Sequence, residues 1–253
     1  MSNKLANKVV IVTGASKGIG AGIAKQMGAE GAKVVVNYVS SKEDADNVVN
    51  AITNQGGTAI AIQGDVSKSD DVKRLFGETK EAFGGLDVLV NNAGIYWALP
   101  LADFTEDAYR KMFDVNVLGT LLTSHEALTL FDEKGGSIIN ISSVAGRDPE
   151  VTLSVYGATK AAMSLLTTSL SKELGPKNIR VNSILSSMIL TEGLASLGLV
   201  ANTDNPYINL MTSRTALGRL GTAEEIGHVA VFLSTDEASF VTGQEIEVSG
   251  GFK

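Results

Sequence analysis

Short runs of β-branched and other apolar residues alternate with longer helical patterns along the whole chain, and this alternation restricts the fold more than any other feature. Strand patterns separated by helical patterns are typical of βαβ units, which build a parallel sheet covered by helices on both faces. Seven such runs lie at Lys8–Thr13, Lys33–Tyr38, Thr58–Gln63, Leu86–Asn91, Ser137–Ser142, Arg180–Leu185 and Glu245–Val248. The sequence therefore predicts an α/β fold with a doubly wound, seven-stranded parallel sheet.

Three of the longer patterns carry clear helix signals, and they lie at Gly18–Glu30, Leu153–Leu174 and Thr222–Ser234. The last one opens with Thr222 and Glu225 at the spacing of a capping box, in which each side chain accepts from the other residue's backbone N–H. The second one stops at Gly175-Pro176, a pair that does not continue a helix.

The chain shows no Pro/Gly/Ser-rich linker, charge block or internal repeat, so residues 1–253 are expected to form one domain. Residues 186–214 are the exception to this regular pattern. This segment is too long for an ordinary connection and mixes glycines and Asn205-Pro206 with apolar residues. Long insertions of this kind usually form binding loops or lids, so we expect a substrate-binding loop here, with a variable surface excursion as the alternative.

Composition excludes several classes of function. The formal net charge of −7 and the pI near 4.9 argue against a nucleic acid or an anionic membrane as partner. There is no cysteine, which excludes disulfides, thiolate metal sites and cysteine nucleophiles. His125 and His228 lack partners at ligand spacing, so no metal is expected. The longest apolar run near the start, Val9–Val12, is too short for a secretory or membrane-spanning segment, which favours a cytoplasmic protein.

A glycine-rich turn joins the first predicted strand to the first predicted helix, and it reads Thr13-Gly14-Ala15-Ser16-Lys17-Gly18-Ile19-Gly20. Glycine permits the tight turn and lets backbone N–H groups at the helix N-terminus approach a pyrophosphate. The setting between a strand and a helix favours a dinucleotide site of the Rossmann type over a merely structural turn.

Two further motifs follow in order: Asn91-Asn92-Ala93-Gly94 after the fourth predicted strand, and Tyr156-Gly157-Ala158-Thr159-Lys160 in a helix. With the G-x-x-x-G-x-G spacing of the turn, they resemble the short-chain dehydrogenase/reductase family from Lys8 to Gly251. The chain is similar to the branch of 3-oxoacyl carrier-protein reductases, glucose 1-dehydrogenases and ketoreductases. The resemblance implies an NAD(P)-dependent oxidoreductase that transfers hydride between nicotinamide and a carbonyl or alcohol carbon.

The resemblance also implies that the cofactor lies along the edge formed by the carboxyl ends of the strands. There Asp65 would accept a hydrogen bond from the adenine amino group, with a turn or N-cap role as the alternative. Thr191 matches the residue that contacts the carboxamide. The expected cofactor-binding residues are Gly14, Ser16, Lys17, Gly18, Ile19, Gly20, Asn37, Tyr38, Ser40, Ser41, Asp65, Val66, Asn92, Ala93, Gly94, Tyr156, Lys160 and Thr191.

The end of the second predicted strand usually decides between NAD and NADP, because an acidic side chain there binds the ribose diol and repels a 2′-phosphate. This chain has Asn37 at that place, followed by hydroxyl donors at residues 38, 40 and 41, and Lys17 supplies a cation. The arginine that many NADP-preferring relatives carry near Val39 is missing. We expect NADP(H) to be favoured and NAD(H) to be accepted, with Asn37→Asp reversing the preference.

Tyr156 and Lys160 lie one helical turn apart on one face. A tyrosine serves as general acid or base near neutral pH if its pKa of about 10 falls, and the neighbouring ammonium of Lys160 is expected to lower it. By the resemblance, Ser143 polarises the substrate oxygen, with Ser142 as the runner-up, and Asn116 supports Lys160 through water. The implied catalytic residues are Asn116, Ser143, Tyr156 and Lys160.

The chain departs from the family after the sixth predicted strand, where Ser186-Ser187 replaces the usual Pro-Gly. If residue 187 needs a positive φ, serine there is strained by about 1 kcal/mol, and restoring Pro-Gly should stabilise the protein. A looser turn would also admit bulkier substrates.

Three classes of function stay open. A ketone or aldehyde reductase is favoured by possible pocket residues, which are Tyr96, Trp97, Ser143, Leu153, Ser187, Met188, Leu194, Leu197 and Leu199. A sugar or polyol dehydrogenase is suggested by the resemblance of Val36-Asn37-Tyr38 and Lys42-Glu43-Asp44 to the glucose dehydrogenase branch. A 3-oxoacyl carrier-protein reductase would need a basic patch beside the pocket. Ser186-Ser187 alone supports a non-catalytic nicotinamide sensor. The resemblance implies a homotetramer that pairs the helices holding Asn116 and Tyr156.

Overall fold

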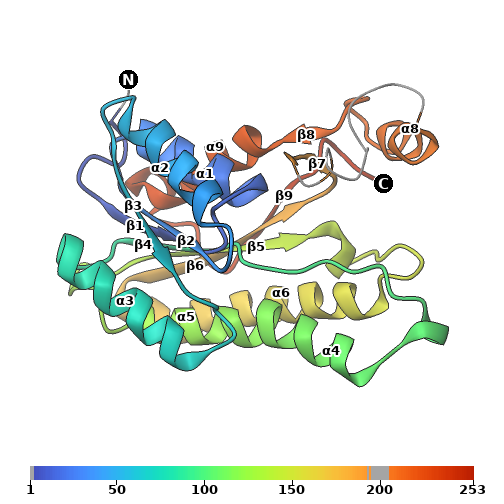
Figure 1. Cartoon of the computed structure of the whole chain (residues 1–253), viewed down its shortest axis with the longest axis horizontal. Helices are drawn as coiled ribbons and strands as arrows, with labels where there is room; N and C mark the ends of the chain where they lie inside the picture. Colours follow the sequence, from blue (N-terminus) through green and yellow to red (C-terminus); the bar gives the residue numbers. More distant parts are fainter. Residues whose placement is uncertain (1–2, 193, 195–204) are drawn as a thin grey trace.

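A computed structural model describes residues 3–192, 194 and 205–253. Its seven main strands pair in parallel in the order β3-β2-β1-β4-β5-β6-β9, so the predicted sheet is confirmed (Figure 1). The strands are β1 (Val9–Val12), β2 (Lys33–Tyr38), β3 (Thr58–Gln63), β4 (Val88–Asn91), β5 (Gly136–Ser143), β6 (Ile179–Ser186) and β9 (Glu245–Val248). The strand order reverses direction between β1 and β4, which is where ligands bind in open parallel sheets.

Helices cover both faces of the sheet, with α1, α2 and α9 on one face and α3, α5 and α6 on the other (Figure 1). The α-helices are α1 (Gly18–Ala29), α2 (Lys42–Thr53), α3 (Ser69–Phe83), α4 (Glu106–Phe113), α5 (Gly119–Ala127), α6 (Ser154–Leu174), α8 (Pro206–Ser213) and α9 (Ala223–Ser234). A π-helical segment, Asp114–Leu118, joins α4 to α5 without a break. Within the described residues, no helix is both long and apolar enough to cross a membrane.

The strands are apolar throughout because they are buried on both sides. In β1, Val10 and Val12 belong to the core under α1 and α9, whereas Val9 and Ile11 belong to the core under α3. This arrangement follows from the period of two in a strand, which sends successive side chains to opposite faces.

The helix signals of the sequence are found at the ends of α6 and α9. Thr222 Oγ1 accepts from Glu225 N–H at 3.3 Å, and Glu225 Oε2 accepts from Thr222 N–H at 2.9 Å, which completes the capping box. α6 ends at Leu174, directly before Gly175-Pro176.

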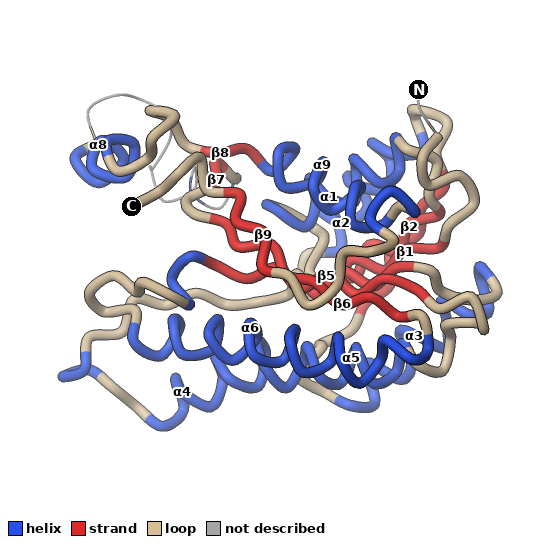
Figure 2. Tube along the Cα trace, turned by 180° about the vertical axis from the view of Figure 1, so that it is seen from behind, coloured by secondary structure: helices blue, strands red, loops and turns tan. Residues whose placement is uncertain are grey.

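A small additional layer stands beyond the carboxyl edge of the sheet, next to the C-terminus (Figure 2). The strands β7 (Ile189–Leu190) and β8 (Gly221–Thr222) pair there, and they are too short to leave a periodic pattern in the sequence. α8 packs on them through Ile208 and Met211, which form a cluster with Leu220 and the half-buried Phe252.

The expected strain at Ser187 is absent, so that expectation is wrong. The described residues other than glycine that have a positive φ are Asn7, Thr152 and Asn178, and Ser187 is not among them. Its hydroxyl donates to the Ser249 carbonyl at 3.1 Å, and Ser186 lies in register between Ser143 of β5 and Val248 of β9. Glycine at residue 187 would lose that hydrogen bond and gain no relief of strain, so restoring Pro-Gly is not expected to stabilise the protein.

Candidate active site

The turn between β1 and α1 needs its glycines for two reasons. Gly14 and Gly18 adopt left-handed φ angles of 60° and 61°. At Gly20, a Cβ atom would lie 2.4 Å from Asn92 Nδ2 and 2.6 Å from the Gly14 carbonyl oxygen. Backbone conformation thus favours glycine at residues 14 and 18, and close packing requires it at residue 20.

The loop after β4 is fastened to this turn by Asn92 and Thr13. Asn92 Nδ2 donates to the carbonyls of Thr13 and Gly14 at 2.9 and 3.0 Å. Thr13 Oγ1 in turn accepts from the N–H groups of Asn92 and Ala93, both at 3.0 Å. Two of the sequence motifs thus form one unit at the point where the strand order reverses.

We expect Gly20→Ala to lower the free energy of unfolding by about 1–3 kcal/mol, because the added methyl forces this unit apart. Gly77→Ala is the matched control, since Gly77 lies exposed inside α3 and a Cβ there meets nothing within 4 Å. It should stabilise the protein by about 0.5–1 kcal/mol through helix propensity. Urea unfolding measures both changes, and equal effects of the two variants would refute the packing argument.

Asn37 does not face a cofactor, so the expectation that it contacts the ribose is wrong. Its side chain is fully buried, accepts from Gly14 N–H at 3.1 Å and donates to the carbonyls of Ile62 and Gly64 at 3.3 and 3.0 Å. These hydrogen bonds connect the glycine turn to the end of β3 and hold it in place. Asn37→Asp would place a charge among carbonyl oxygens and destabilise the fold instead of changing cofactor preference.

The other residues expected at the ribose end lie just after β2 and in the glycine turn. Val39 is 50% exposed, Ser40 is exposed and Ser41 is half-buried, whereas Tyr38 is buried. In the turn, Lys17 is exposed, while Ser16 and Ile19 are half-buried.

Asp65 and Val66, after β3, have local structural roles in this structure. Asp65 Oδ1 accepts from Ser67 N–H at 3.0 Å and from Ser67 Oγ at 2.7 Å, which is the turn role kept as the alternative above. Val66 is buried against Gly119, where a Cβ would lie 2.7 Å from Val66 Cγ2.

The N–H of Gly18, at the start of α1, donates to a carboxylate of the protein itself. It donates to Glu192 Oε2 at 3.0 Å, and the Thr191 side chain lies beside the same glycine. A carboxylate is a chemical stand-in for a phosphate at a helix N-terminus, where the helix dipole favours negative charge. The Gly18 N–H therefore fits the pyrophosphate of a dinucleotide, which Gly18 and the neighbouring backbone of the turn would hold.

Tyr156 lies in the first turn of α6, where three elements meet. The Ser143 hydroxyl, at the end of β5, hydrogen-bonds the phenol, and the ring of Tyr96 approaches edge-on with a centroid distance of 5.1 Å. Ser142, the runner-up, points away, because its hydroxyl donates to the Lys160 carbonyl at 3.3 Å. Of the two serines, Ser143 is the one placed beside Tyr156.

Lys160 is buried one turn further along α6. Its ammonium donates to the Ile141 carbonyl at 2.9 Å and lies 5.8 Å from the centroid of the Tyr156 ring. A Cβ on Gly94 would lie 3.7 Å from this ammonium, so the loop after β4 reaches the same place.

The pKa values of this pair depart from the sequence-based expectation. Burial raises the pKa of Tyr156 to about 12, although the hydrogen bond from Ser143 opposes the shift. Burial also lowers the pKa of Lys160 to about 8. Burial is the largest cause of the shift at Tyr156, and the expected lowering of its pKa by Lys160 is not found. Tyr156 carries its proton at neutral pH.

Asn116 lies in the π-helical segment and joins three parts of the site. Its Oδ1 accepts from Ile95 N–H at 2.8 Å, while its Nδ2 donates to the Ile95 carbonyl and to Thr159 Oγ1, both at 3.0 Å. The fully buried side chain thus ties the loop after β4 to α6. It is not an ordinary polar residue of a helix surface.

Comparison with known proteins identifies this arrangement. The family model described as enoyl-(acyl carrier protein) reductase matches residues 14–253. The chain is 46% identical over 251 residues to an uncharacterized oxidoreductase of Methylorubrum extorquens, covering 99% of this chain and 100% of that one. It is 38% identical to 3beta-hydroxysteroid dehydrogenase 1 of Eggerthella lenta (99% and 95% covered) and 37% identical to a 3-oxoacyl-[acyl-carrier-protein] reductase of Staphylococcus aureus (96% and 97% covered).

A solved structure agrees with these relatives. A short-chain dehydrogenase from Burkholderia cenocepacia in complex with NADP is 36% identical, with a TM-score of 0.90 and 98% of each chain covered. The chain belongs to the short-chain dehydrogenase/reductase family. This short-chain dehydrogenase/reductase is an NAD(P)-dependent oxidoreductase that acts on CH–OH and C=O groups.

The residues expected to line a substrate pocket are only partly described in this short-chain dehydrogenase/reductase. Tyr96 is 53% exposed, and Trp97 is 38% exposed with Lys111 Nζ 5.6 Å from its ring centroid. Leu153 is buried as the N-cap of α6, and Met188 packs toward α8. Ser187 and Leu194 are half-buried, whereas Leu197 and Leu199 lie outside the described residues.

Two residues that the sequence did not single out also reach the site. Glu192 binds the glycine turn, as described above, and the Tyr207 hydroxyl pairs with that of Tyr96. Asn205-Pro206 is a helix-start signal that could have placed Tyr207 in the first turn of α8, but no sequence pattern points to Tyr96 as its partner.

We expect Glu192→Gln to lower the Kd for NADPH about two- to five-fold, because the charged carboxylate leaves a helix N-terminus that the pyrophosphate then occupies. Glu224→Gln, at the N-terminus of α9, is the matched control. Fluorescence titration of NADPH checks the result, and unchanged or weaker binding would show that Glu192 does not compete.

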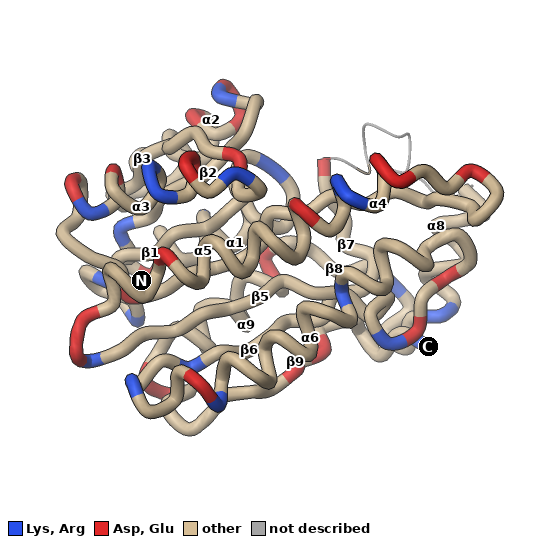
Figure 3. The backbone as a smooth tube through the Cα atoms, turned by 90° about the horizontal axis from the view of Figure 1, so that it is seen from below, with Lys and Arg blue, Asp and Glu red and all other residues tan. Residues whose placement is uncertain are grey.

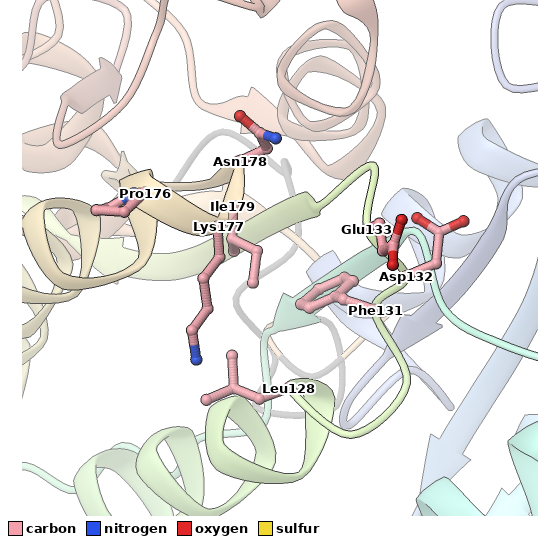
Figure 4. Close-up of a pocket in the computed structure, with 8 residues that line it drawn as sticks. All are labelled: Leu128, Phe131, Asp132, Glu133, Pro176, Lys177, Asn178 and Ile179. Atoms are coloured by element: carbon pink, nitrogen blue, oxygen red, sulfur yellow. The ribbon is translucent and has the colours of Figure 1, made fainter.

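A cavity of about 550 Å³ lies at the opposite end of the sheet (Figure 4). Its lining residues are Leu128, Phe131, Asp132, Glu133, Pro176, Lys177, Asn178 and Ile179. They lie where β5 and β6 begin, whereas the site lies at the carboxyl ends of the strands. The described residues contain no cluster of three or more His, Asp or Glu side chains that could hold a metal ion.

Proposed function

We propose that this short-chain dehydrogenase/reductase is an NADPH-dependent reductase of apolar ketones that also accepts NADH, with Tyr156 as the general acid. The observation that carries the proposal is the environment of Tyr156. A half-buried phenol with a pKa of about 12, hydrogen-bonded by Ser143 and one helical turn from Lys160, can donate its proton to a developing alkoxide.

Each residue of the site has a role in this reaction. When bound, the reduced nicotinamide supplies a hydride to the carbonyl carbon. Ser143 donates a hydrogen bond to the carbonyl oxygen and stabilises the negative charge that develops there. Tyr156 transfers its proton to that oxygen, and the ammonium of Lys160 stabilises the phenolate left behind. Asn116 positions α6 against the loop after β4 through Thr159 and Ile95.

The preference for NADPH is supported by the charges near the end of β2. Residues 39–41 contain no carboxylate and two hydroxyls, and the exposed Lys17 supplies a cation for a 2′-phosphate. Val39→Asp would set a carboxylate against that phosphate and should favour NADH. Parallel kinetics with the two cofactors test the preference, and a lower KM for NADH in the unchanged enzyme would contradict it.

The apolar substrate class is supported by Tyr96 and Trp97, and by the named activity of the hydroxysteroid dehydrogenase relative. Reduction of 3-oxoacyl carrier protein is the second candidate, supported by the relative of that name. It would need a basic surface for an acidic carrier. Figure 3 shows basic positions interspersed with acidic ones, which favours the small-molecule ketone.

A panel of carbonyl compounds tests the proposed function. NADPH and NADH oxidation would be followed with aryl ketones, diketones, a 3-oxosteroid and acetoacetyl esters, and glucose would be tested in the oxidative direction. We expect turnover to be fastest with an apolar ketone. Faster oxidation of glucose would favour the sugar dehydrogenase, and NADPH binding without turnover would favour the nicotinamide sensor.

The proposed assembly is a cytoplasmic homotetramer that pairs the helices bearing Asn116 and Tyr156. Leu118 and Leu121 are 40% and 37% exposed beside Asn116, and Leu165 of α6 is 75% exposed. Exposed leucines on both helices support an interface with closed symmetry. Light scattering at micromolar concentration should give a tetramer, and a stable monomer would contradict it.

A further inference from the structure

Two tyrosines from distant parts of the chain meet beside Tyr156. Tyr96 follows the Asn91–Gly94 motif, and its ring lies edge-on to that of Tyr156 at an interplanar angle of 76°. Tyr207 comes from the first turn of α8 and is 41% exposed. The hydroxyls of Tyr96 and Tyr207 pair, and burial together with this neighbour raises the pKa of Tyr96. The contact therefore joins α8 to the loop that borders the proton donor.

The N-terminal end of α8, which carries Tyr207, is held by a cap and by packing. Asn205 Oδ1 accepts from the N–H groups of Tyr207 and Ile208 at 2.9 and 3.3 Å, which caps the helix. Ile208 and Met211 are buried in the cluster with Leu220. The side chain of Tyr207 thus projects from an anchored turn.

The C-terminal end of α8 is held as well. The guanidinium of Arg214 lies 4.6 Å from the centroid of the Phe252 ring and forms an ion pair with Glu150. Arg214 Nε also donates to the Lys253 carbonyl at 2.5 Å. Because both ends of α8 are tied down, Tyr207 occupies a defined place opposite Tyr96.

We propose that Tyr96 and Tyr207 determine the substrate specificity of the enzyme, forming a wall beside Tyr156 that accepts flat aryl ketones and excludes ketones with bulky branched substituents. This inference rests on the proposed ketone reduction. Aromatic faces bind flat, apolar groups with little loss of side-chain freedom, and a paired wall leaves less room than either ring alone. In the proposed reaction the proton comes from Tyr156, so the rings of Tyr96 and Tyr207 would act through the shape of the space beside it.

Three variants separate the ring from the hydroxyl. Tyr207→Ala removes the outer half of the wall, whereas Tyr207→Phe and Tyr96→Phe keep the rings and remove the hydroxyl pairing. Tyr109→Ala is the matched control, because Tyr109 is also 41% exposed but lies on α4, with its ring centroid 4.5 Å from that of Phe113. The measured quantity is the ratio of kcat/KM for a branched aryl ketone to that for a flat one, together with the Kd for NADPH.

We expect Tyr207→Ala to raise this ratio about ten-fold or more, the two Phe variants to raise it about two- to five-fold, and the Kd for NADPH to stay within about two-fold. Tyr109→Ala should leave the ratio unchanged. If wild type and the control reduce ketones but the ratio of Tyr207→Ala stays within about two-fold of wild type, the specificity inference is wrong and ketone reduction stands. If wild type reduces no ketone, the proposed function is wrong, and this inference with it. Should Tyr207→Ala fold poorly, the two Phe variants decide the question by the same ratio.

Discussion

Tyr156→Phe is expected to lower kcat by about 10²- to 10⁴-fold while the Kd for NADPH changes by less than about two-fold. The variant keeps the aromatic ring and its edge-on contact with Tyr96 and removes only the hydroxyl that hydrogen-bonds Ser143. Proton transfer to the alkoxide is then lost, whereas the glycine turn that would hold the pyrophosphate is untouched. Steady-state kinetics and cofactor titration measure the two quantities.

Tyr109→Phe, on α4, is the control for removing a tyrosine hydroxyl elsewhere in the protein. It should keep the kcat of the wild type. If Tyr156→Phe retained more than about a tenth of the wild-type kcat, Tyr156 would not be the acid.

Lys160→Met is expected to stabilise the cofactor-free protein by about 1–3 kcal/mol at pH 7 and to lower kcat/KM by about 10²-fold or more. Lys160 is 5% exposed, and its ammonium donates to the Ile141 carbonyl and to Met163 Sδ. Lowering the pKa from 10.5 to about 8 corresponds to a destabilisation on the order of 3 kcal/mol when the lysine is charged. A methionine of similar length removes both the destabilisation caused by the buried charge and the charge that the reaction needs.

The pH dependence of this destabilisation follows from the pKa of Lys160, which is about 8 in the folded protein and 10.5 in the unfolded protein. Below pH 8 the lysine is charged in both folded and unfolded protein, so the destabilisation is fully present. Between pH 8 and 10.5 only the unfolded protein keeps the proton, and the destabilisation declines as pH rises. Unfolding curves of the wild type and Lys160→Met should therefore converge over this window. Lys172→Met, exposed on the same helix, should show no such convergence, and a pH-independent gain for Lys160→Met would contradict the account.

The sheet could be predicted from the sequence because its strands are buried on both faces. A strand such as β2, with Val34, Val35 and Val36 all buried, leaves a continuous apolar run bounded by helical patterns. The same reasoning could not find β7 and β8, which are two residues long and are held by pairing with each other.

The candidate site was predictable where a motif fixes the backbone and not where distant contacts decide. The glycine turn and the Tyr156–Lys160 spacing are local features, so their residues meet as expected. Asn37 was misjudged because its partners are backbone groups of Gly14, Ile62 and Gly64, which no pattern links to it.

The predictions for Tyr156 and Ser187 also differ from the structure, again because contacts with distant parts of the chain decide the outcome. The pKa of Tyr156 depends on burial, which a helical spacing does not reveal. The backbone angle at Ser187 depends on the strand and loop that surround it, so the replacement of Pro-Gly by two serines did not by itself indicate strain.

Hydride transfer to carbon is tested most directly by isotope tracing. NADPH deuterated at the transferable C4 position of nicotinamide would be oxidised with an aryl ketone in ordinary water, and the alcohol product would be analysed by mass spectrometry and NMR. We expect one deuterium on the carbinol carbon, and none there when unlabelled NADPH is used in deuterated water. Oxidation of the labelled cofactor without deuterium on that carbon would contradict the assignment of this protein as a carbonyl reductase.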